Sequence, residues 1–222
     1  MKQKIIKDKV KLNDRKKRTE SSRKWLVRQL NDPYVHLAKS KGLRSRAAFK
    51  LEEIVKKYNL FQNAKVIVDL GAAPGGWTQV CQTLKPKATI IALDIQEFDP
   101  IPGTLQIIGD VTDPLILDQL KTALDDQKVD VVLSDMAASA CGIPSVDHDR
   151  IMNLLDVVVH FGIEHLNING HLVGKVLRGG TENNLLSILK KYFKKVTHFK
   201  PESSRQESAE MYVVAQSFKG IL

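Results

Sequence analysis

Two patterns of apolar residues alternate along the chain. Short runs of consecutive apolar residues are typical of buried strands, and they occupy residues 66–70, 89–94, 105–108, 129–134, 170–177, 195–199 and 211–217. Segments whose apolar residues recur every three or four positions are typical of amphipathic helices, and they occupy residues 45–60, 76–84, 114–124, 148–166 and 182–193. Strands that alternate with helices predict an α/β fold, in which a parallel sheet carries helices on both faces.

The first of these helices and the last two strands carry further signals. One face of the helix predicted at residues 45–60 is apolar and consists of Ala48, Leu51, Ile54 and Val55. Ser45 is a candidate N-cap for this helix. The last two strands are joined by KPESSRQESAE, residues 200–210, with no crossover helix. These two strands are therefore predicted to pair antiparallel.

Positive charge is concentrated in the first quarter of the chain. The net charge is +9, but residues 1–50 hold 17 Lys or Arg against 4 Asp or Glu, whereas residues 51–222 hold 17 against 21. Such an asymmetry indicates a polyanionic partner, with nucleic acid favoured over a membrane surface. Aromatic residues between the cations could stack on unpaired bases; they include Trp25, Tyr34 and Phe49. The alternative is a solubilising tail, and residues 1–20 are expected to be mobile or loosely helical.

The composition narrows the class of protein. Hydrophobic residues make up 43% and charged residues 27% of the chain, which is typical of a globular protein. The two cysteines, Cys81 and Cys141, lack any metal-binding spacing, so we expect no metal and a reduced, cytoplasmic protein. The charged N-terminus does not read as a signal peptide, and no apolar run approaches the roughly 18 residues of a membrane span.

The stretch VIVDLGAAPGGWTQV, residues 66–80, joins the first strand to the helix that follows. In doubly wound sheets this turn is where a nucleotide-like ligand lies. Gly71, Gly75 and Gly76 would let a ligand approach the backbone closely, although a plain tight turn is the alternative. The spacing is GxxxGG, which is neither the dinucleotide fingerprint GxGxxG nor a P-loop. The ligand is therefore expected to lack a pyrophosphate or triphosphate.

Acidic residues follow the next strands at their carboxyl ends. Asp94 ends the second strand, where a carboxylate can accept hydrogen bonds from both ribose hydroxyls. Asp110 follows the third strand and suits an adenine edge. A glycine loop with these two acids predicts an adenosine ligand without phosphate, and S-adenosylmethionine fits. The sulfonium and ammonium charges of that ligand would suit Asp69 and Asp135.

Five motifs together resemble a known family, namely SRAAFKL, VDLGAAPGGWTQV, LSDMA, GKVLRG and SSRQESAEMYVVA. In this order, over about residues 20–218, the chain is similar to the FtsJ/RrmJ-like RNA 2′-O-ribose methyltransferases. The resemblance implies a Rossmann-like methyltransferase fold, with a seven-stranded, mostly parallel sheet whose last but one strand lies at the edge. We divide the chain accordingly into a basic extension, residues 1–42, that contacts RNA or the ribosome, and a methyltransferase domain, residues 43–222.

The resemblance also implies the residues that act. The family's Lys-Asp-Lys-Glu tetrad falls on Lys50, Asp135, Lys175 and Glu210, with Lys175 as the general base. The family's contacts with the donor, S-adenosylmethionine, fall on Gly75, Trp77, Asp94, Asp110 and Asp135. By resemblance the substrate is a uridine of 23S ribosomal RNA in the large ribosomal subunit, and the protein is a monomer. Where the family usually has Asp-Met-Ala-Pro-Asn, this chain has DMAAS, residues 135–139, which leaves the contacts of that substrate loop open.

The chemistry of the implied reaction suits these residues. A ribose 2′-hydroxyl is a poor nucleophile and must lose its proton as the methyl group is transferred. A lysine can accept that proton only when it is neutral, and a neighbouring ammonium and burial both favour the neutral form. We therefore expect Lys50 to lower the pKa of Lys175. Asp135 and Glu210 push that pKa the other way, so their expected role is to orient the lysines by hydrogen bonding. Trp77 would either pack beside the donor or fill the core beneath the loop.

Three other functions are alternatives to this one. A cytosine-5 RNA methyltransferase needs a cysteine nucleophile where this chain has Ala138, and Cys141 lies three residues too late. An amino-group methyltransferase would have Asp/Asn-Pro-Pro-Tyr/Phe in place of DMAA. A non-catalytic RNA-binding or ribosome-assembly factor on a methyltransferase fold would have no need of the complete tetrad.

Overall fold

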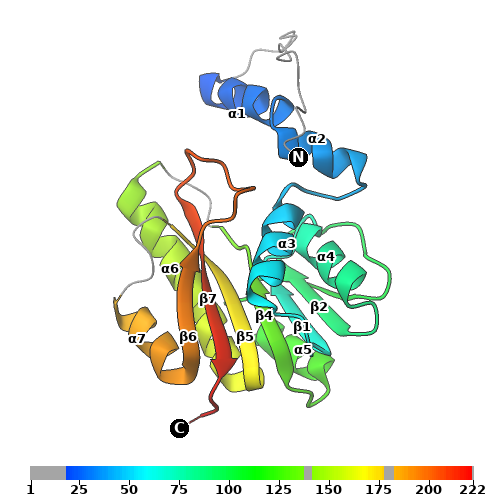
Figure 1. The fold of residues 1–222 in the computed structure, drawn as a ribbon, viewed down its shortest axis with the longest axis vertical. Helices are drawn as coiled ribbons and strands as arrows, with labels where there is room; N and C mark the ends of the chain where they lie inside the picture. Colours follow the sequence, from blue (N-terminus) through cyan, green and yellow to red (C-terminus); the bar gives the residue numbers. More distant parts are fainter. Residues whose placement is uncertain (1–18, 138–141, 178–182, 222) are drawn as a thin grey trace.

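A computed structural model describes residues 19–137, 142–177 and 183–221 (Figure 1). Seven strands form one sheet in the order β3-β2-β1-β4-β5-β7-β6. Their bounds are β1 Val66–Leu70, β2 Thr89–Asp94, β3 Leu105–Ile108, β4 Val129–Ser134, β5 Leu166–Leu177, β6 Phe193–Phe199 and β7 Glu210–Phe218. Strands β1 to β5 pair in parallel, and β7 pairs antiparallel with both β5 and β6. The α/β fold, the antiparallel final pair and the edge position of β6 are therefore confirmed.

Helices cover both faces of the sheet. One face carries α3 Ala47–Tyr58 and α4 Gly76–Leu84, and the other carries α5 Pro114–Leu124, α6 Pro144–His165 and α7 Asn183–Tyr192. Successive residues of β1 point to opposite faces, as the period of two in a strand requires. Ile67 packs beneath α3 and α4, whereas Val68 and Leu70 pack against the α6 side of the sheet. Both layers are needed because every residue of β1 is buried.

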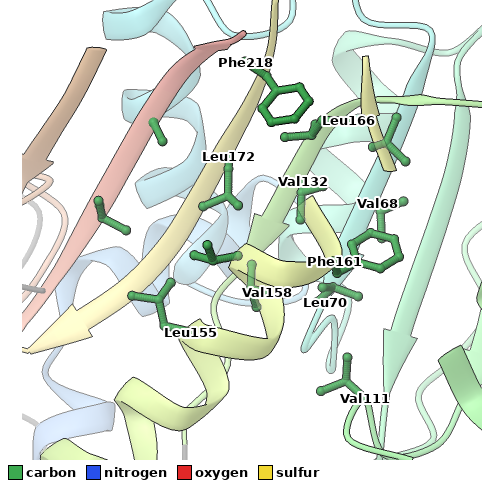
Figure 2. Packing of buried hydrophobic residues seen from close by; sticks show 14 of the residues in the cluster. Val68, Leu70, Val111, Val132, Leu155, Val158, Phe161, Leu166, Leu172 and Phe218 are labelled. Carbon is green, nitrogen blue, oxygen red and sulfur yellow. The ribbon is translucent and has the colours of Figure 1, made fainter. Parts of the chain in front are cut away.

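The larger core lies between the sheet and α6 (Figure 2). Val132 and Leu172 come from neighbouring strands, and Leu155 and Val158 come from α6, and all four are at most 2% exposed. The apolar spacing of α6 directs one face of the helix onto the strands, which stabilises both elements by removing that face from water. This core lies beneath the strand ends at which the predicted site residues gather.

Two further helices precede the sheet. They are α1 Glu20–Leu30 and α2 Pro33–Ser40, within the segment that the sequence indicated only as a basic extension. Helix α2 begins after Asp32, because Asp32 accepts a hydrogen bond from Tyr34 N at 3.0 Å and Pro33 occupies the first turn. Of the segment expected to be loosely helical, residues 1–18 lie outside the described ranges.

The sequence misplaced several element boundaries. The predicted cap Ser45 is wrong, since Arg46 stands at the N-cap of α3 without a side-chain cap. The Ser45 hydroxyl instead faces α4, where a Cβ on Gly76 would overlap it. Strand β5 begins at Leu166, four residues earlier than predicted. Leu166 pairs with Val129 of β4, and after a shift in register the pairing continues from His171 with Val131. No helix in the described ranges has both the length and the apolar character needed to cross a bilayer.

Candidate active site

The loop after β1 makes a close approach to the end of β4. Gly71 has φ of 80°, and a Cβ there would overlap the Met136 side chain. Its backbone N–H donates to Leu93 O at 2.8 Å, so the loop is also fastened to the end of β2. Glycine is required at this position both for the positive φ and for the close approach. The loop thereby forms one wall of a cavity at the ends of β1, β2, β3 and β4.

This cavity has a volume of about 360 Å³ and is lined by residues at the carboxyl ends of four neighbouring strands. Three acidic residues face it from successive strands, namely Asp94, Asp110 and Asp135. Its apolar lining includes Leu93, Ile95 and Val111. A cavity of this size, largely apolar with a few convergent polar groups, is typical of a small-molecule site.

Backbone hydrogen bonds orient two of these carboxylates. Asp94 accepts hydrogen bonds from Ala73 N at 2.8 Å and from Gln96 N at 2.7 Å. Asp110 uses one oxygen, Oδ1, for both Thr112 N and the Thr112 hydroxyl, each at 2.8 Å. The bonds from Thr112 hold the pKa of the Asp110 carboxyl below its ordinary value, so this acid is charged at neutral pH. Both acids therefore present fixed acceptors to a ligand with hydroxyl or amino donors.

A cluster of charged residues adjoins the cavity at Asp135. Lys175 Nζ lies 2.8 Å from Asp135 Oδ1 and 3.8 Å from Glu210 Oε1. Lys50 Nζ lies 3.1 Å from Glu210 Oε2 and 4.0 Å from Asp135 Oδ2. Lys50 and Lys175 are only 7% and 6% exposed, and Lys175 also donates to the backbone oxygen of Asp135 at 2.8 Å, so protein groups rather than water surround each ammonium. The structure thus brings together the four residues of the predicted tetrad from α3, the end of β4, β5 and β7.

Tyr212 belongs to the same cluster, and the sequence reasoning missed it. Its hydroxyl donates to Asp135 Oδ1 at 2.6 Å and accepts from Lys50 Nζ at 3.1 Å. Tyr212 pairs with Lys175 across β5 and β7 and lies two residues after Glu210, so all three side chains share one face of the sheet. The period of two in the strand EMYVVA was the signal that could have found it.

Comparisons with known proteins agree with this geometry. The family model for FtsJ-like methyltransferases matches residues 43–218. The chain belongs to the FtsJ-like methyltransferase family. It is 51% identical over 217 residues to the ribosomal RNA large subunit methyltransferase E of Paramagnetospirillum magneticum, covering 95% of this chain and 88% of that relative. The enzyme of the same name from Novosphingobium aromaticivorans is 49% identical, with 94% of each chain covered.

Solved structures show the same relationship. A structure described as a ribosomal RNA methyltransferase from Plasmodium falciparum superposes with a TM-score of 0.71 at 34% identity, covering 80% of this chain and all of that one. The fibrillarin/Nop5p complex contains a chain with a TM-score of 0.52 at 15% identity, which shows a shared fold alone. The protein is therefore a methyltransferase, and its family implies a methyl donor.

The charges around Lys175 change the protonation expected for this lysine. Burial lowers the pKa of Lys175, but the Asp135 and Glu210 carboxylates outweigh it and raise the pKa above the ordinary lysine value. Burial opposes ionisation of Asp135 and Glu210 as well, yet the two lysines hold both of their pKa values below the ordinary range. The expected lowering of the Lys175 pKa by Lys50 is therefore wrong for the free protein, because each ammonium faces carboxylates rather than the other ammonium.

Three predicted donor contacts of the methyltransferase lie away from the cavity lining. Gly75 is the N-cap of α4, with φ of 98°, and a Cβ there would meet the Arg44 guanidinium. The Trp77 ring is 3% exposed, packs 5.5 Å from the Tyr212 ring and donates to Ala47 O at 2.8 Å. Asp69 is fully buried, where it accepts from the Thr78 hydroxyl at 2.6 Å. Burial raises the pKa of Asp69 to about 7.

The loop after β4 is described only in part. Asp135, Met136 and Ala137 line the cavity, whereas the departure from the family motif at Ala138 and Ser139 lies outside the described residues. Among the residues that the structure describes, no three His, Cys, Asp or Glu side chains are grouped to hold a metal ion.

Proposed function

We propose that this methyltransferase transfers a methyl group from S-adenosylmethionine to a ribose 2′-hydroxyl of a uridine in 23S ribosomal RNA of the large ribosomal subunit, with Lys175 as the general base. The main support for this proposal is that Asp135 belongs both to the cavity and to the charged cluster. This residue lines the cavity, and its carboxylate binds Lys175 at 2.8 Å. A methyl donor in the cavity and a proton acceptor at Lys175 would therefore meet at one residue.

The residues of the cavity fit S-adenosylmethionine. Asp94 has both carboxylate oxygens fixed by backbone N–H groups, which suits recognition of the ribose hydroxyls. Asp110 has one oxygen free of bonds to Thr112 and is placed at the next strand end, which suits the adenine amino group. Asp135 supplies a negative charge near the cationic end of the donor. When bound, the donor supplies an electrophilic methyl group on a sulfonium.

Lys175 must give up a proton before it can act as a base. In the free protein its ammonium is stabilised by Asp135 and Glu210. A positive charge in the cavity beside Asp135 would compete for that carboxylate and lower the pKa of Lys175. Lys50 and Tyr212 both reach the same acidic residues, so they would keep Asp135 and Glu210 oriented while Lys175 accepts the proton of the hydroxyl. Asp135 thus links donor binding to activation of the base.

The identity of the RNA rests on the relatives. Those from Paramagnetospirillum magneticum and Novosphingobium aromaticivorans carry names that specify large-subunit ribosomal RNA, and the chain covers 88% and 94% of their lengths. The excess of cations in residues 1–42 supports a nucleic-acid substrate bound through phosphate contacts. We propose that residues 1–42 act as this RNA-contacting extension of a domain at residues 43–222, in a cytoplasmic, monomeric enzyme.

Mapping of ribose methylation tests the proposal. Large subunits from cells that lack the protein would be incubated with labelled donor and purified enzyme, and the RNA would then be hydrolysed in alkali, which leaves 2′-O-methylated linkages intact. We expect one protected uridine linkage in 23S RNA that is also present in wild-type cells and missing from the deletion strain. Binding to the subunit without any methyl transfer would instead support the non-catalytic assembly factor.

A further inference from the structure

Asp32 uses its two carboxylate oxygens for different purposes. Oδ1 accepts from Tyr34 N at 3.0 Å and caps α2. Oδ2 accepts from the Arg46 guanidinium and from Arg205 Nε, the latter at 3.0 Å. The residue is only 6% exposed, so the two arginines are its main source of charge compensation. A single buried carboxylate therefore joins three separate segments of the chain.

The two arginines come from the segments that carry Lys50 and Glu210. Arg46 is the N-cap of α3 and precedes Lys50 by one helical turn, and it also donates to Ser203 O in the connection between β6 and β7. Arg205 lies in that same connection, five residues before Glu210. Since Lys50 and Glu210 are themselves joined at 3.1 Å, the Asp32 cluster is a second link between the same two segments. This link also includes the N-terminal helices.

Further contacts hold α1 and α2 against this link. Arg205 donates to Gln29 Oε1 of α1 at 2.9 Å, and the Tyr34 ring of α2 lies 5.5 Å from the Phe49 ring of α3. Figure 1 shows both helices beyond the end of the sheet at which β7 begins. Glu210, the first residue of β7, belongs to the tetrad, so the helices lie at the active-site end of the sheet. The exposed cations on these helices and at the C-cap of α2 include Arg28, Lys39 and Lys41. A basic surface is thus held in a defined place relative to the tetrad.

Another aspartate in the chain shows what helix capping alone requires. Asp113 precedes Pro114 at the start of α5, just as Asp32 precedes Pro33, and its Oδ1 accepts from Leu115 N at 2.9 Å. Within the described ranges Asp113 forms no ion pair. The cap needs one oxygen, so the arginines at Asp32 serve a different purpose.

We propose that Asp32 is a positioning residue for the RNA substrate. Through Arg46 and Arg205 it holds the basic α1–α2 pair at a fixed place relative to Lys50 and Glu210, so that phosphates bound on these helices place the target ribose at Lys175. This inference rests on the proposed methylation of RNA. Loss of the carboxylate charge would leave two largely buried guanidinium groups facing each other, and the helix pair would move away from the active-site edge.

Asp32→Asn tests the inference, with Asp113→Asn as the matched control. Asparagine is an equally good N-cap, so both helices keep their caps and only the charge at Asp32 is removed. For Asp32→Asn we expect KM for large ribosomal subunits lacking the modification to rise about tenfold, the equivalent of one charged hydrogen bond. The kcat and the affinity for S-adenosylmethionine should stay within about twofold, and trypsin should cleave faster within residues 39–46. Asp113→Asn should change none of these.

A second variant tests whether Asp32 acts through the proposed partner. Arg205→Gln should raise KM as Asp32→Asn does, and the double variant should be no worse than either single variant, because both remove the same link. Unchanged KM and unchanged cleavage in Asp32→Asn would overturn the inference. It would also be overturned if kcat and the affinity for S-adenosylmethionine fell by as much as KM rose, because Asp32 would then be a merely structural residue. If the wild-type enzyme does not methylate the subunits, the proposed function fails instead, and the cleavage comparison still tests the link.

Discussion

At the scale of single residues, the site depends on charges that are neutralised by close partners rather than by water. Two lysines and two carboxylates form ion pairs of 2.8–4.0 Å in a region where both lysines are buried. These close contacts raise the pKa of Lys175 and lower the pKa values of Asp135 and Glu210, so the charged forms of these three groups are favoured. In the free protein Lys175, the proposed base, therefore holds its proton.

The protonation of Lys175 can be tested in the free protein. Asp135→Asn removes a negative charge 2.8 Å from the ammonium, so the pKa of Lys175 should fall. NMR titration of ¹⁵N-labelled lysine side chains would measure this shift without any donor or RNA. Asp118→Asn, an exposed carboxylate on α5, is the control and should leave the titration unchanged. A Lys175 pKa that stays the same in Asp135→Asn would contradict the assigned electrostatics.

Donor recognition gives a second prediction for a single residue. Asp110→Ala should weaken binding of S-adenosylmethionine by about 1–3 kcal/mol, because a hydrogen-bonding N–H or O–H group of the ligand would lose its acceptor. Isothermal titration calorimetry measures this affinity, and Asp118→Ala serves again as the control. The assignment of Asp110 to the donor site would have to be abandoned if its variant bound the donor as tightly as the wild type does.

At the scale of elements, most strands and helices were predictable and the N-terminal helices were not. Strands β1 to β4 matched their apolar runs, since buried strands of a parallel sheet need little information beyond hydrophobicity. Helix α1 was missed because it is rich in charge. Helix α2 was missed because it is short and is held by contacts far away in sequence, such as that between Asp32 and Arg205. The tetrad positions could be predicted from the family motifs. The place of Tyr212 in their network could not be predicted from those motifs, because it depends on the register of β5 with β7.

The N-terminal extension makes a prediction of its own. Removing residues 1–28 takes away 12 Lys or Arg and 3 Asp or Glu. RNA binding should weaken, and the slope of log affinity against log salt should become shallower by about 0.7–0.9 for each phosphate that the protein no longer neutralises. Donor affinity should stay constant, since the cavity is lined by residues from Gly71 onward. Filter binding at several salt concentrations provides the measurement.

A full-length variant separates charge from bulk in this extension. Replacement of the 12 Lys and Arg residues by Gln keeps the length of the chain and should reproduce the shallower salt dependence. If either variant kept the wild-type affinity and salt slope, the extension would be a solubiliser rather than an RNA-binding segment.

At the scale of the whole molecule, one buried acid outside the ion-pair cluster should make stability fall with rising pH. The pKa of Asp69 is about 7 in the folded protein, against 3.8 when unfolded. Between these values the folded state holds a proton that the unfolded state has released, so rising pH favours unfolding up to about pH 7. Asp135 and Glu210, with lowered pKa values, act in the opposite sense and favour the folded state once the pH exceeds their unfolded values.

Asp69→Asn isolates the contribution of this buried acid. The amide can still accept the hydrogen bond from Thr78 but does not titrate. The difference in free energy of unfolding between the variant and the wild type should be larger at pH 8 than at pH 5 by about 1 kcal/mol or more, in favour of the variant. Urea denaturation at the two pH values gives this difference, with the exposed Asp118→Asn as the control. A difference of zero would mean that Asp69 is ionised in the folded protein at both pH values.

We propose that Lys175 accepts the proton of a ribose hydroxyl. The decisive measurement is the single-turnover rate of methyl transfer to large ribosomal subunits by Lys175→Ala and Lys175→Arg. We expect a loss of roughly 10²–10⁴ in rate for Lys175→Ala, with the affinity for S-adenosylmethionine nearly unchanged. Lys175→Arg should not restore the rate, because a guanidinium stays protonated. An active Lys175→Arg enzyme with the pH profile of the wild type would contradict the claim and leave Lys175 as an electrostatic group alone.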